Sequence, residues 1–213
     1  ESMGRAFEFR KARKMKRWSA MAKTFTRIGK DIVMAVKEGG PNPETNARLR
    51  AVMQNAKAAN MPKDNVERAI KKASDKDTAD YKEILFEGYA PHGIAVLIET
   101  ATDNNNRTVA DVRHLFSKSG GSMGQTGSVS YLFDRKGIFE IPATGLDEME
   151  LFELVVDAGA EDLVLEDDQF IVTTPIEQFG AVQAALDEAG ITPEEASLQR
   201  IPTTTTVLPP EDA

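Results

Sequence analysis

Positive charge is concentrated near the start of the chain, where residues 9–18 read FRKARKMKRW and six of these ten are Lys or Arg. The cations continue at Lys23, Arg27 and Lys30, so residues 9–30 hold nine cations and no Asp or Glu. Like charges at such spacing destabilise a helix, whereas exposed helices usually mix both signs. Phosphates would offset this cost, because each Lys or Arg on a phosphate releases a counterion. The segment therefore predicts a helix that contacts nucleic acid, with docking on the protein's own acidic part as the alternative.

Further cations follow in the next two predicted helices and would widen the same surface. Arg offers phosphates a planar fork that Lys lacks, so the two residue types are not equivalent here. Trp18 could stack on a base, but it falls on the apolar stripe of the helix, which favours packing in the core. The predicted nucleic-acid contacts are Arg10, Lys11, Arg13, Lys14, Lys16, Arg17, Lys23, Arg27, Lys30, Lys57, Lys63, Arg68, Lys71 and Lys72.

The charge of the chain is divided unequally along its length. The 213 residues carry a net charge of -8, but residues 1–72 carry +11 and residues 73–213 carry -19. Such asymmetry suggests that one part of a chain meets a polyanion. The acidic part would repel nucleic acid, restrict its contact to one face and leave other surfaces for protein partners.

A polar segment, TDNNNRT at residues 102–108, is a candidate second contact site, together with the glycine-rich loop SGGSMGQTG at residues 119–127. Asn side chains and an Arg at the start of a helix could bind an anion or RNA. A loop capped by its own side chains, which needs no ligand, is the alternative that the residues alone favour. The residues of this second site are Asn104, Asn105, Asn106, Arg107 and Thr108.

Catalytic and metal sites are not expected. The glycine-rich loop lacks the GKS or GKT of a P-loop and precedes a strand rather than a helix, which argues against nucleotide hydrolysis. The chain has no Cys, and its two His residues, His92 and His114, have no obvious partners. The acidic residues 161–168 lack the spacing of an EF-hand loop and are expected to form a solvated turn. We therefore expect no enzymatic activity, no cofactor and no metal.

The absence of Cys also fits a reducing compartment. No run of 18 apolar residues is present, and no apolar segment of a signal peptide follows the Arg-rich start. A transit peptide is the alternative for such a start, but helical patterning continues directly into the next segment. A cytoplasmic protein without membrane contact is expected, and Glu1 and Ser2, ahead of Met3, are interpreted as a tag remnant.

The first third of the chain has the pattern of helices. Apolar residues at spacings of three and four over residues 9–36 predict one long helix, which the sequence GGPNP at residues 39–43 should end. Two more helices are expected, at residues 43–59 and, after the sequence NMP, as far as residue 73. Three helices with short connections predict a small bundle.

Beyond residue 76 strands and helices alternate. Strands are expected at residues 84–89, 94–100, 128–133 and 138–141, with a helix after the Asn cluster and a turn at residues 134–137. Two helices and four short strand-like stretches follow, at residues 147–158, 163–165, 170–173, 176–189, 197–201 and 204–208. At 41% hydrophobic the chain can bury a core, so we predict an α+β protein of several domains.

Four motifs together resemble the YebC/PmpR family, which includes the mitochondrial translational activator of cytochrome c oxidase. They are PxxNxxLR at residues 43–50, AKxxNMPKDxxERAI at residues 56–70, GYxPxGxAxLxExxTDNxNRT at residues 88–108 and GGxxGxxGSVxYxF at residues 120–133. The resemblance covers nearly the whole chain. One departure is the opening GRAFEFRKARKMKRW, where the family resembles GHSKWANIKHRK, so contacts made by that opening do not transfer.

The resemblance implies a three-helix bundle followed by two α/β sandwich-like domains. The basic bundle would occupy residues 3–76, the middle domain residues 77–134 and 196–213, and a third domain, inserted in the second, residues 135–195. Relatives usually continue into an acidic helix and a final strand. The middle domain is therefore expected to be incomplete.

The resemblance also implies a function. Family members are commonly described as DNA-binding transcriptional regulators, so a non-enzymatic regulator that binds DNA through its basic N-terminal domain is expected. The alternative is a ribosome-associated translation factor or activator that contacts rRNA or tRNA and relieves stalling, and a third reading is a protein-docking adaptor. Phosphate contact is common to DNA and RNA, and the lack of a recognition-helix signature favours RNA, so the residues leave the target open.

Overall fold

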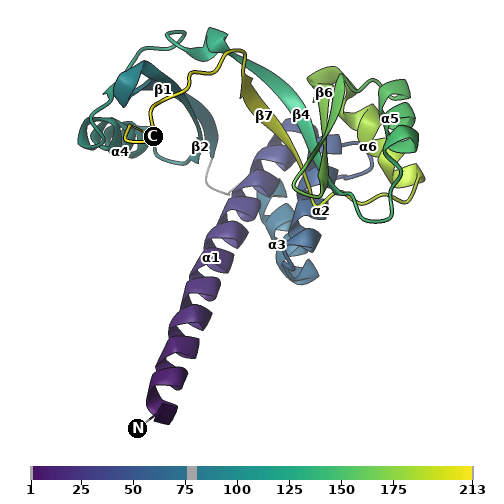
Figure 1. Ribbon diagram of the computed structural model, residues 1–213, viewed down its shortest axis with the longest axis horizontal. Coiled ribbons are helices and arrows are strands. Elements are labelled where there is room, and N and C mark those ends of the chain that lie inside the picture. The colour runs from purple at the N-terminus through teal and green to yellow at the C-terminus, as the bar shows by residue number, and fades with distance from the viewer. Residues whose placement is uncertain (1, 76–80, 213) are drawn as a thin grey trace. The chain divides into compact units, whose positions relative to one another are not determined.

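The computed structural model describes residues 2–75 and 81–212, with side chains from residue 19 onward. The chain divides into two compact units, Glu1–Lys76 and Asp77–Ala213 (Figure 1). The first holds only helices and the second holds helices and two antiparallel sheets, so the predicted α+β class is confirmed. Within the described residues, no helix combines the length and the apolar character needed to span a bilayer.

Three helices form the first unit: α1 (Ser2–Gly39), α2 (Ala47–Ala58) and α3 (Lys63–Ser74). α1 packs against both of the others along the apolar stripe that the sequence predicted. Each fully buried Ile, Leu or Val on these faces contributes about 1.5–3 kcal/mol. The buried apolar side chains of this unit are Ile28, Ile32, Val33, Ala35, Val36, Leu49, Ala51, Val52, Ala56, Val66 and Ala73.

A buried amide, Asn46, fixes the angle between α1 and α2. Its Nδ2 donates to the carbonyl oxygens of Ala35, at 2.7 Å, and Gly40, at 2.9 Å. Its Oδ1 accepts from the N–H of Leu49 at 3.0 Å and caps the start of α2. The helix therefore begins at Ala47 rather than at residue 43, because the cap, and not the Pro-rich turn, satisfies its first N–H groups.

The second unit begins with a three-stranded sheet in the order β2-β1-β3. Its elements are β1 (Lys82–Ala90), β2 (Ile94–Thr102), α4 (Asn105–Lys118) and β3 (Ser122–Met123). α4 packs on one face, where Phe86, Val112 and Phe116 form the centre of the core. The tight turn between β1 and β2 holds His92 at φ 66°, so this His serves the turn, as expected of a structural residue.

A four-stranded sheet in the order β5-β6-β4-β7 follows. Its strands are β4 (Phe133–Pro142), β5 (Asp162–Glu166), β6 (Gln169–Pro175) and β7 (Glu195–Pro202), and its helices are α5 (Glu148–Asp157) and α6 (Phe179–Glu188). This β-α-β-β-α-β order is a split β-α-β arrangement. The rings of Phe139 and Phe179 stack at 4.9 Å between sheet and helix.

Three local predictions were wrong. The expected strand at residues 128–133 holds the short 3₁₀ turn Ser130–Leu132, and the expected turn at residues 134–137 lies inside β4. Gly137 suggested a turn, but it lies inside the strand. The position needs glycine because a Cβ there would lie 2.5 Å from Oγ1 of Thr174. Residues 204–208 form no regular strand, and Val207 is 94% exposed.

The last strand also differs from expectation. We expected residues 196–213 to return to the middle domain, but β7 pairs with β4 along eight positions, from Phe133 with Pro202 to Glu140 with Glu195. The strand pairing buries Ala196 in the four-stranded sheet. Contact with the first sheet comes from the end of β7, where Nε of Arg200 donates to Oε1 of Glu99 in β2 at 2.9 Å. Beyond the strand, the N–H of Thr203 donates to the carbonyl of Leu132. The boundaries of the three domains stay predictions.

Candidate nucleic-acid interface

The described part of α1 presents one face of positive charge. Lys23, Arg27 and Lys30 are spaced by four and three residues, so they lie on the same side of the helix. All three are exposed, while Ile28 and Ile32 are buried on the side that packs against α2 and α3. We call Lys23, Arg27 and Lys30 the α1 cationic face. Its position opposite the core leaves all three charges available to a partner.

The α1 cationic face has no acidic residue within the stretch of helix that carries it. Residues 19–30 contain no Asp or Glu, and none of the three cations forms an ion pair with another described residue. None of the three cations is therefore neutralised by a described carboxylate of the first unit, and docking of this face on the acidic unit stays an alternative. The first acidic residue is Asp31, which is partly buried at the edge of this face.

The same stretch of α1 offers little that could read a base. The hydroxyl of Thr24 donates to the carbonyl of Ala20 at 3.0 Å, and that of Thr26 donates to the carbonyl of Ala22 at 2.9 Å. Both hydroxyls are thus used inside the helix, and no Asn or Gln occurs in residues 19–30. The stretch therefore lacks the amides that read adenine, while its Lys and Arg can contact phosphates, which carry no sequence information, as well as guanine edges.

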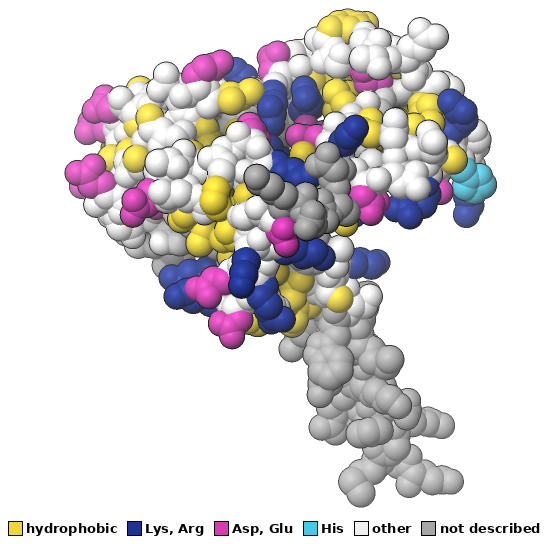
Figure 2. Space-filling view, turned by 180° about the vertical axis from the view of Figure 1, so that it is seen from behind, with side chains coloured by type: hydrophobic (Ala, Val, Ile, Leu, Met, Phe, Trp, Pro, Cys, Tyr) yellow, Lys and Arg dark blue, Asp and Glu magenta, His cyan; other side chains and the backbone are white. Residues whose placement is uncertain are grey.

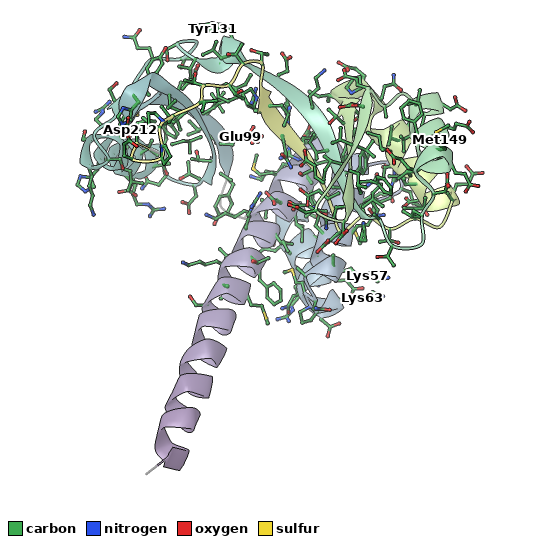
Figure 3. All side chains as sticks on the ribbon, viewed as in Figure 1. Lys57, Lys63, Glu99, Tyr131, Met149 and Asp212 are labelled. Atoms are coloured by element: carbon green, nitrogen blue, oxygen red, sulfur yellow. The ribbon has the colours of Figure 1, made fainter. Side chains whose placement is uncertain are left out.

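The cations of α2 and α3 form a less uniform surface. Figure 3 shows Lys57 and Lys63 near each other at the turn that joins the two helices. Lys63 forms an ion pair with Glu67 at 3.6 Å, and Arg68 donates to the backbone of Asp64 and to Oδ1 of Asn65. Figure 2 shows Lys and Arg side chains gathered over this end of the unit, with acidic ones among them. The predicted widening residues are all exposed: Lys57, Lys63, Arg68, Lys71 and Lys72.

Because α3 mixes both signs, it resembles an ordinary solvated helix surface more than α1 does. Its outer face carries Asp64 and Glu67 beside its cations. The structure therefore separates two groups within the predicted set, with the α1 cationic face being the one that lacks acidic partners. The remaining predicted contacts belong to α1, but their side chains, like that of Trp18, lie outside the described residues; they are Arg10, Lys11, Arg13, Lys14, Lys16 and Arg17.

Most side chains of the predicted second site at the start of α4 bond to other groups of the same segment. Oδ1 of Asn104 accepts from the N–H of Arg107 at 3.0 Å and caps the helix. Nη2 of Arg107 lies 3.2 Å from Oδ1 of Asp103. The hydroxyl of Thr108 donates to Oγ1 of Thr102 at 2.7 Å. This geometry matches the capped loop that the residues alone favoured.

Two members of that segment remain outside these bonds. Asn105 and Asn106 are exposed in the first turn of α4 and make no hydrogen bond through their side chains to another described residue. A role for Asn104, Asn105, Asn106, Arg107 and Thr108 in binding stays a prediction.

The glycine-rich loop does hold an anion in a cradle of N–H groups, and the anion is the protein's own. The carboxylate of Glu87, which is 2% exposed, accepts from the N–H of Gly127 at 2.6 Å, Val129 at 3.0 Å and Ser130 at 2.6 Å. Burial acts to raise the pKa of Glu87, but these backbone donors together hold it below the ordinary 4.5. The end of the loop and the residues that follow it are thereby fixed against β1, and the three N–H groups that form the cradle are already used.

Sequence reasoning missed Asn46 and Glu87, although both stand in the motifs that carry the family resemblance or directly precede one. A polar residue inside an apolar stretch was the available signal: Glu87 follows the sequence ILF, and Asn46 precedes a helix by one residue. Both residues support the fold.

Among the described residues, no group of three or more His, Cys, Asp or Glu could hold a metal ion. The acidic residues 161–168 span the hairpin between β5 and β6, where Asp167 and Asp168 adopt φ 44° and 65°. Nζ of Lys136 lies 2.6 Å from Oε1 of Glu161, and this hydrogen bond raises the pKa of Lys136. The hairpin is the solvated turn that was predicted.

Comparison with known proteins places the chain among relatives of similar length. The family model described as TACO1/YebC protein N-terminal domain matches residues 5–76, and the one described as TACO1/YebC second and third domain matches residues 81–213. A probable transcriptional regulatory protein, FP0835 of Flavobacterium psychrophilum, is 64% identical over 206 residues, covering 97% of this chain and 87% of the relative. Another of the same description, from Cytophaga hutchinsonii, is 53% identical over 203 residues, covering 95% and 85%.

A solved structure is also similar. The crystal structure of the conserved hypothetical protein Aq1575 from Aquifex aeolicus matches with a TM-score of 0.80 at 42% sequence identity. The match covers 90% of this chain and 79% of that one.

Proposed function

The chain belongs to the TACO1/YebC family, and on that premise we propose that it is a non-enzymatic regulator of gene expression that binds DNA through its basic N-terminal unit. Its relatives are named probable transcriptional regulatory proteins. The observation that carries the proposal is the α1 cationic face, three exposed charges with no ion pair to another described residue. Binding of phosphates to such a surface is favourable, because each contact releases counterions into solution.

The proposal assigns different tasks to the two units. The first unit supplies phosphate contacts, chiefly through the α1 cationic face and the cations that precede it in sequence. The second unit, with its excess of carboxylates, is repelled by nucleic acid and orients the contact. No residue is given a catalytic role, and no cofactor is required. We propose the cytoplasm as its location because a chain without Cys suits a reducing compartment.

A second candidate target is structured RNA, including the rRNA or tRNA of a ribosome. The observation that favours it is the absence of Asn and Gln from residues 19–30, where both Thr hydroxyls are bound within the helix, so that base contact there is left to Lys, Arg and Ser19. A protein that holds phosphates alone does not distinguish one duplex sequence from another. Under this candidate the protein acts as a translation factor rather than as a transcription factor.

One binding experiment tests the proposal and separates the candidates. The full chain is titrated with a random-sequence DNA duplex, a promoter duplex, an RNA hairpin and purified ribosomes at two salt concentrations. Preference for one promoter sequence supports transcriptional control, and a steep salt dependence seen only with ribosomes supports translation. If none of the four binds, the nucleic-acid proposal fails and a protein-docking adaptor becomes the better reading.

A further inference from the structure

The second unit contains a long stretch of sequence whose charged residues are all negative. Residues 137–199 hold 16 Asp and Glu and no Lys, Arg or His. They include α5, α6 and most of the four-stranded sheet. Figure 2 shows carboxylates spaced along the outer edge of this lobe, which lies on the left in that view. Repulsion among these charges destabilises the compact fold, so a cationic partner would relieve it.

An apolar stripe crosses this acidic surface on α5. Met149 is 69% exposed, Phe152 45% and Val156 38%, and their spacing of three and four residues places them on one face of the helix. In Figure 3 the side chain of Met149 lies on the outer side of α5. The opposite face of α5 carries the buried Leu151 and Val155, which are 2% and 0% exposed. The exposed stripe is therefore additional to the residues that hold α5 in place.

Carboxylates border the stripe on both sides. By helical geometry Glu148 lies next to it on one side, and Glu153 and Asp157 lie on the other. All three are exposed, and none forms an ion pair with another described residue. An apolar strip with a charged border has the composition of a binding patch, whereas scattered apolar side chains need no explanation.

We propose that this face of α5 binds a cationic amphipathic helix of a partner protein. A helix of matching length places apolar residues between Met149, Phe152 and Val156 and directs its Lys and Arg toward the bordering carboxylates. The negative border rejects nucleic acid and acidic proteins, so it sets the kind of partner as well as its orientation. The proposal goes beyond nucleic-acid binding and does not depend on it.

The described part of α1 does not provide such a helix. Its cations are exposed, but its apolar residues Ile28 and Ile32 are already buried against α2 and α3. It therefore offers charge without the apolar strip that α5 requires. For this reason we assign the partner to another protein rather than to residues 19–39 of a second copy of this chain.

The test uses a fluorescent peptide of about 14 residues, built only from Leu and Lys in an amphipathic helical pattern, as the probe. A peptide of identical composition but permuted order, and a Leu and Glu peptide, serve as probe controls. The full chain should bind the first peptide at least about tenfold more tightly than the permuted one, because only the ordered pattern offers an apolar strip. The acidic peptide should not bind.

Variants of the full chain locate the site. Met149→Ser and Phe152→Ser should each weaken peptide binding about tenfold, and the pair Glu148→Gln with Glu153→Gln should weaken it about threefold to tenfold and flatten its salt dependence. The matched control is Leu115→Ser on α4, another exposed apolar residue, 58% exposed, which should leave binding unchanged. Met149, the more exposed of the two, keeps the test valid if the Phe152 variant folds poorly.

Three results would overturn the proposal: no binding of the ordered peptide, equal binding of the permuted peptide, or binding unchanged by Met149→Ser. Sedimentation of the full chain tests whether a second copy of the chain binds this face instead. If the wild type self-associates and Met149→Ser abolishes the association, the face is an interface between copies and the assignment to a foreign helix is wrong.

Discussion

Removing the α1 cationic face gives the sharpest mutational prediction. The triple change Lys23→Gln, Arg27→Gln and Lys30→Gln keeps side-chain length and polarity while removing three charges. All three side chains are exposed and lie opposite the buried stripe, so the fold should be unaffected. The helix itself should gain slightly, because neighbouring like charges at spacings of three and four are removed.

The size of the binding loss follows from counterion release. The logarithm of the binding constant changes by about 0.9 per phosphate contact for each tenfold change in salt on duplex DNA, and by about 0.7 on single strands. Three lost contacts therefore flatten the slope by about 2–3, which near 0.15 M salt weakens binding roughly 50- to 150-fold. This figure assumes that each of the three cations neutralises one phosphate.

The assay is fluorescence anisotropy with a labelled random-sequence DNA duplex and a labelled RNA hairpin, at several salt concentrations. The matched control removes three exposed cations from the second unit, by Lys82→Gln, Arg113→Gln and Lys118→Gln, and so changes the net charge equally. The account expects a large loss for the first triple variant and little change for the control. Equal losses would show that only net charge matters, and no loss in the first variant would refute the assigned surface.

Three further predictions concern the residues that support the fold. Asn46→Ala should destabilise the first unit by about 2–4 kcal/mol, since it removes a helix cap and leaves the carbonyl of Ala35 buried without its donor, and calorimetry should show a lower Tm for that unit alone. Glu87→Gln should cost the second unit about 2–4 kcal/mol at pH 7. Because the folded pKa of Glu87 lies below its unfolded value near 4.5, this cost should hold above about pH 4.5 and shrink progressively as the pH falls from there through the folded value; a cost that does not shrink below pH 4.5 would contradict the assignment. Glu140→Gln should instead stabilise the second unit by up to about 1 kcal/mol at pH 7, because burial and the nearby Glu195 and Glu194 raise the pKa of Glu140. The gain in stability should vanish as the pH falls through that raised pKa, because the wild-type carboxyl is then already neutral. Urea unfolding at pH 7 and at pH 4 checks this prediction.

Much of the helical part of the fold could be predicted from the sequence. The stripe through Ile28, Ile32 and Val36 has one period and one clear stop, so the end of α1 followed directly from local rules. The start of α2 did not, because its cap reaches back to carbonyls of α1. A tertiary hydrogen bond of this kind leaves no periodic signal.

The sheet region shows the limits of local rules more clearly. Gly137 has the appearance of a turn residue, yet it lies mid-strand because Thr174 and Phe179 pack against its backbone. The pairing of β7 with β4 joins residues that are 55 to 69 positions apart in the sequence, which no local pattern reports. Glu87 was overlooked for a related reason, since its three donors come from a loop about 40 residues away.

The candidate interface, unlike the strand pairing, could be predicted in part from the sequence, because charged residues can be counted without a structure. The absence of Asp and Glu from residues 9–30 identified α1, and the structure adds that the described cations face away from the core. The sequence already shows Asp64 and Glu67 among the cations of α3, but not which of its cations they engage: Lys63 pairs with Glu67, and Arg68 donates to Asn65. That distinction required side-chain positions.

Crosslinking in cells tests the central proposal most directly. The full chain is crosslinked by ultraviolet light, the bound nucleic acid is sequenced, and the crosslinked peptides are identified by mass spectrometry. Nucleic acid attached to peptides within residues 9–72, and absent from residues 137–199, is the result expected here. Recovery of no nucleic acid, or of crosslinks confined to the acidic second unit, would contradict it.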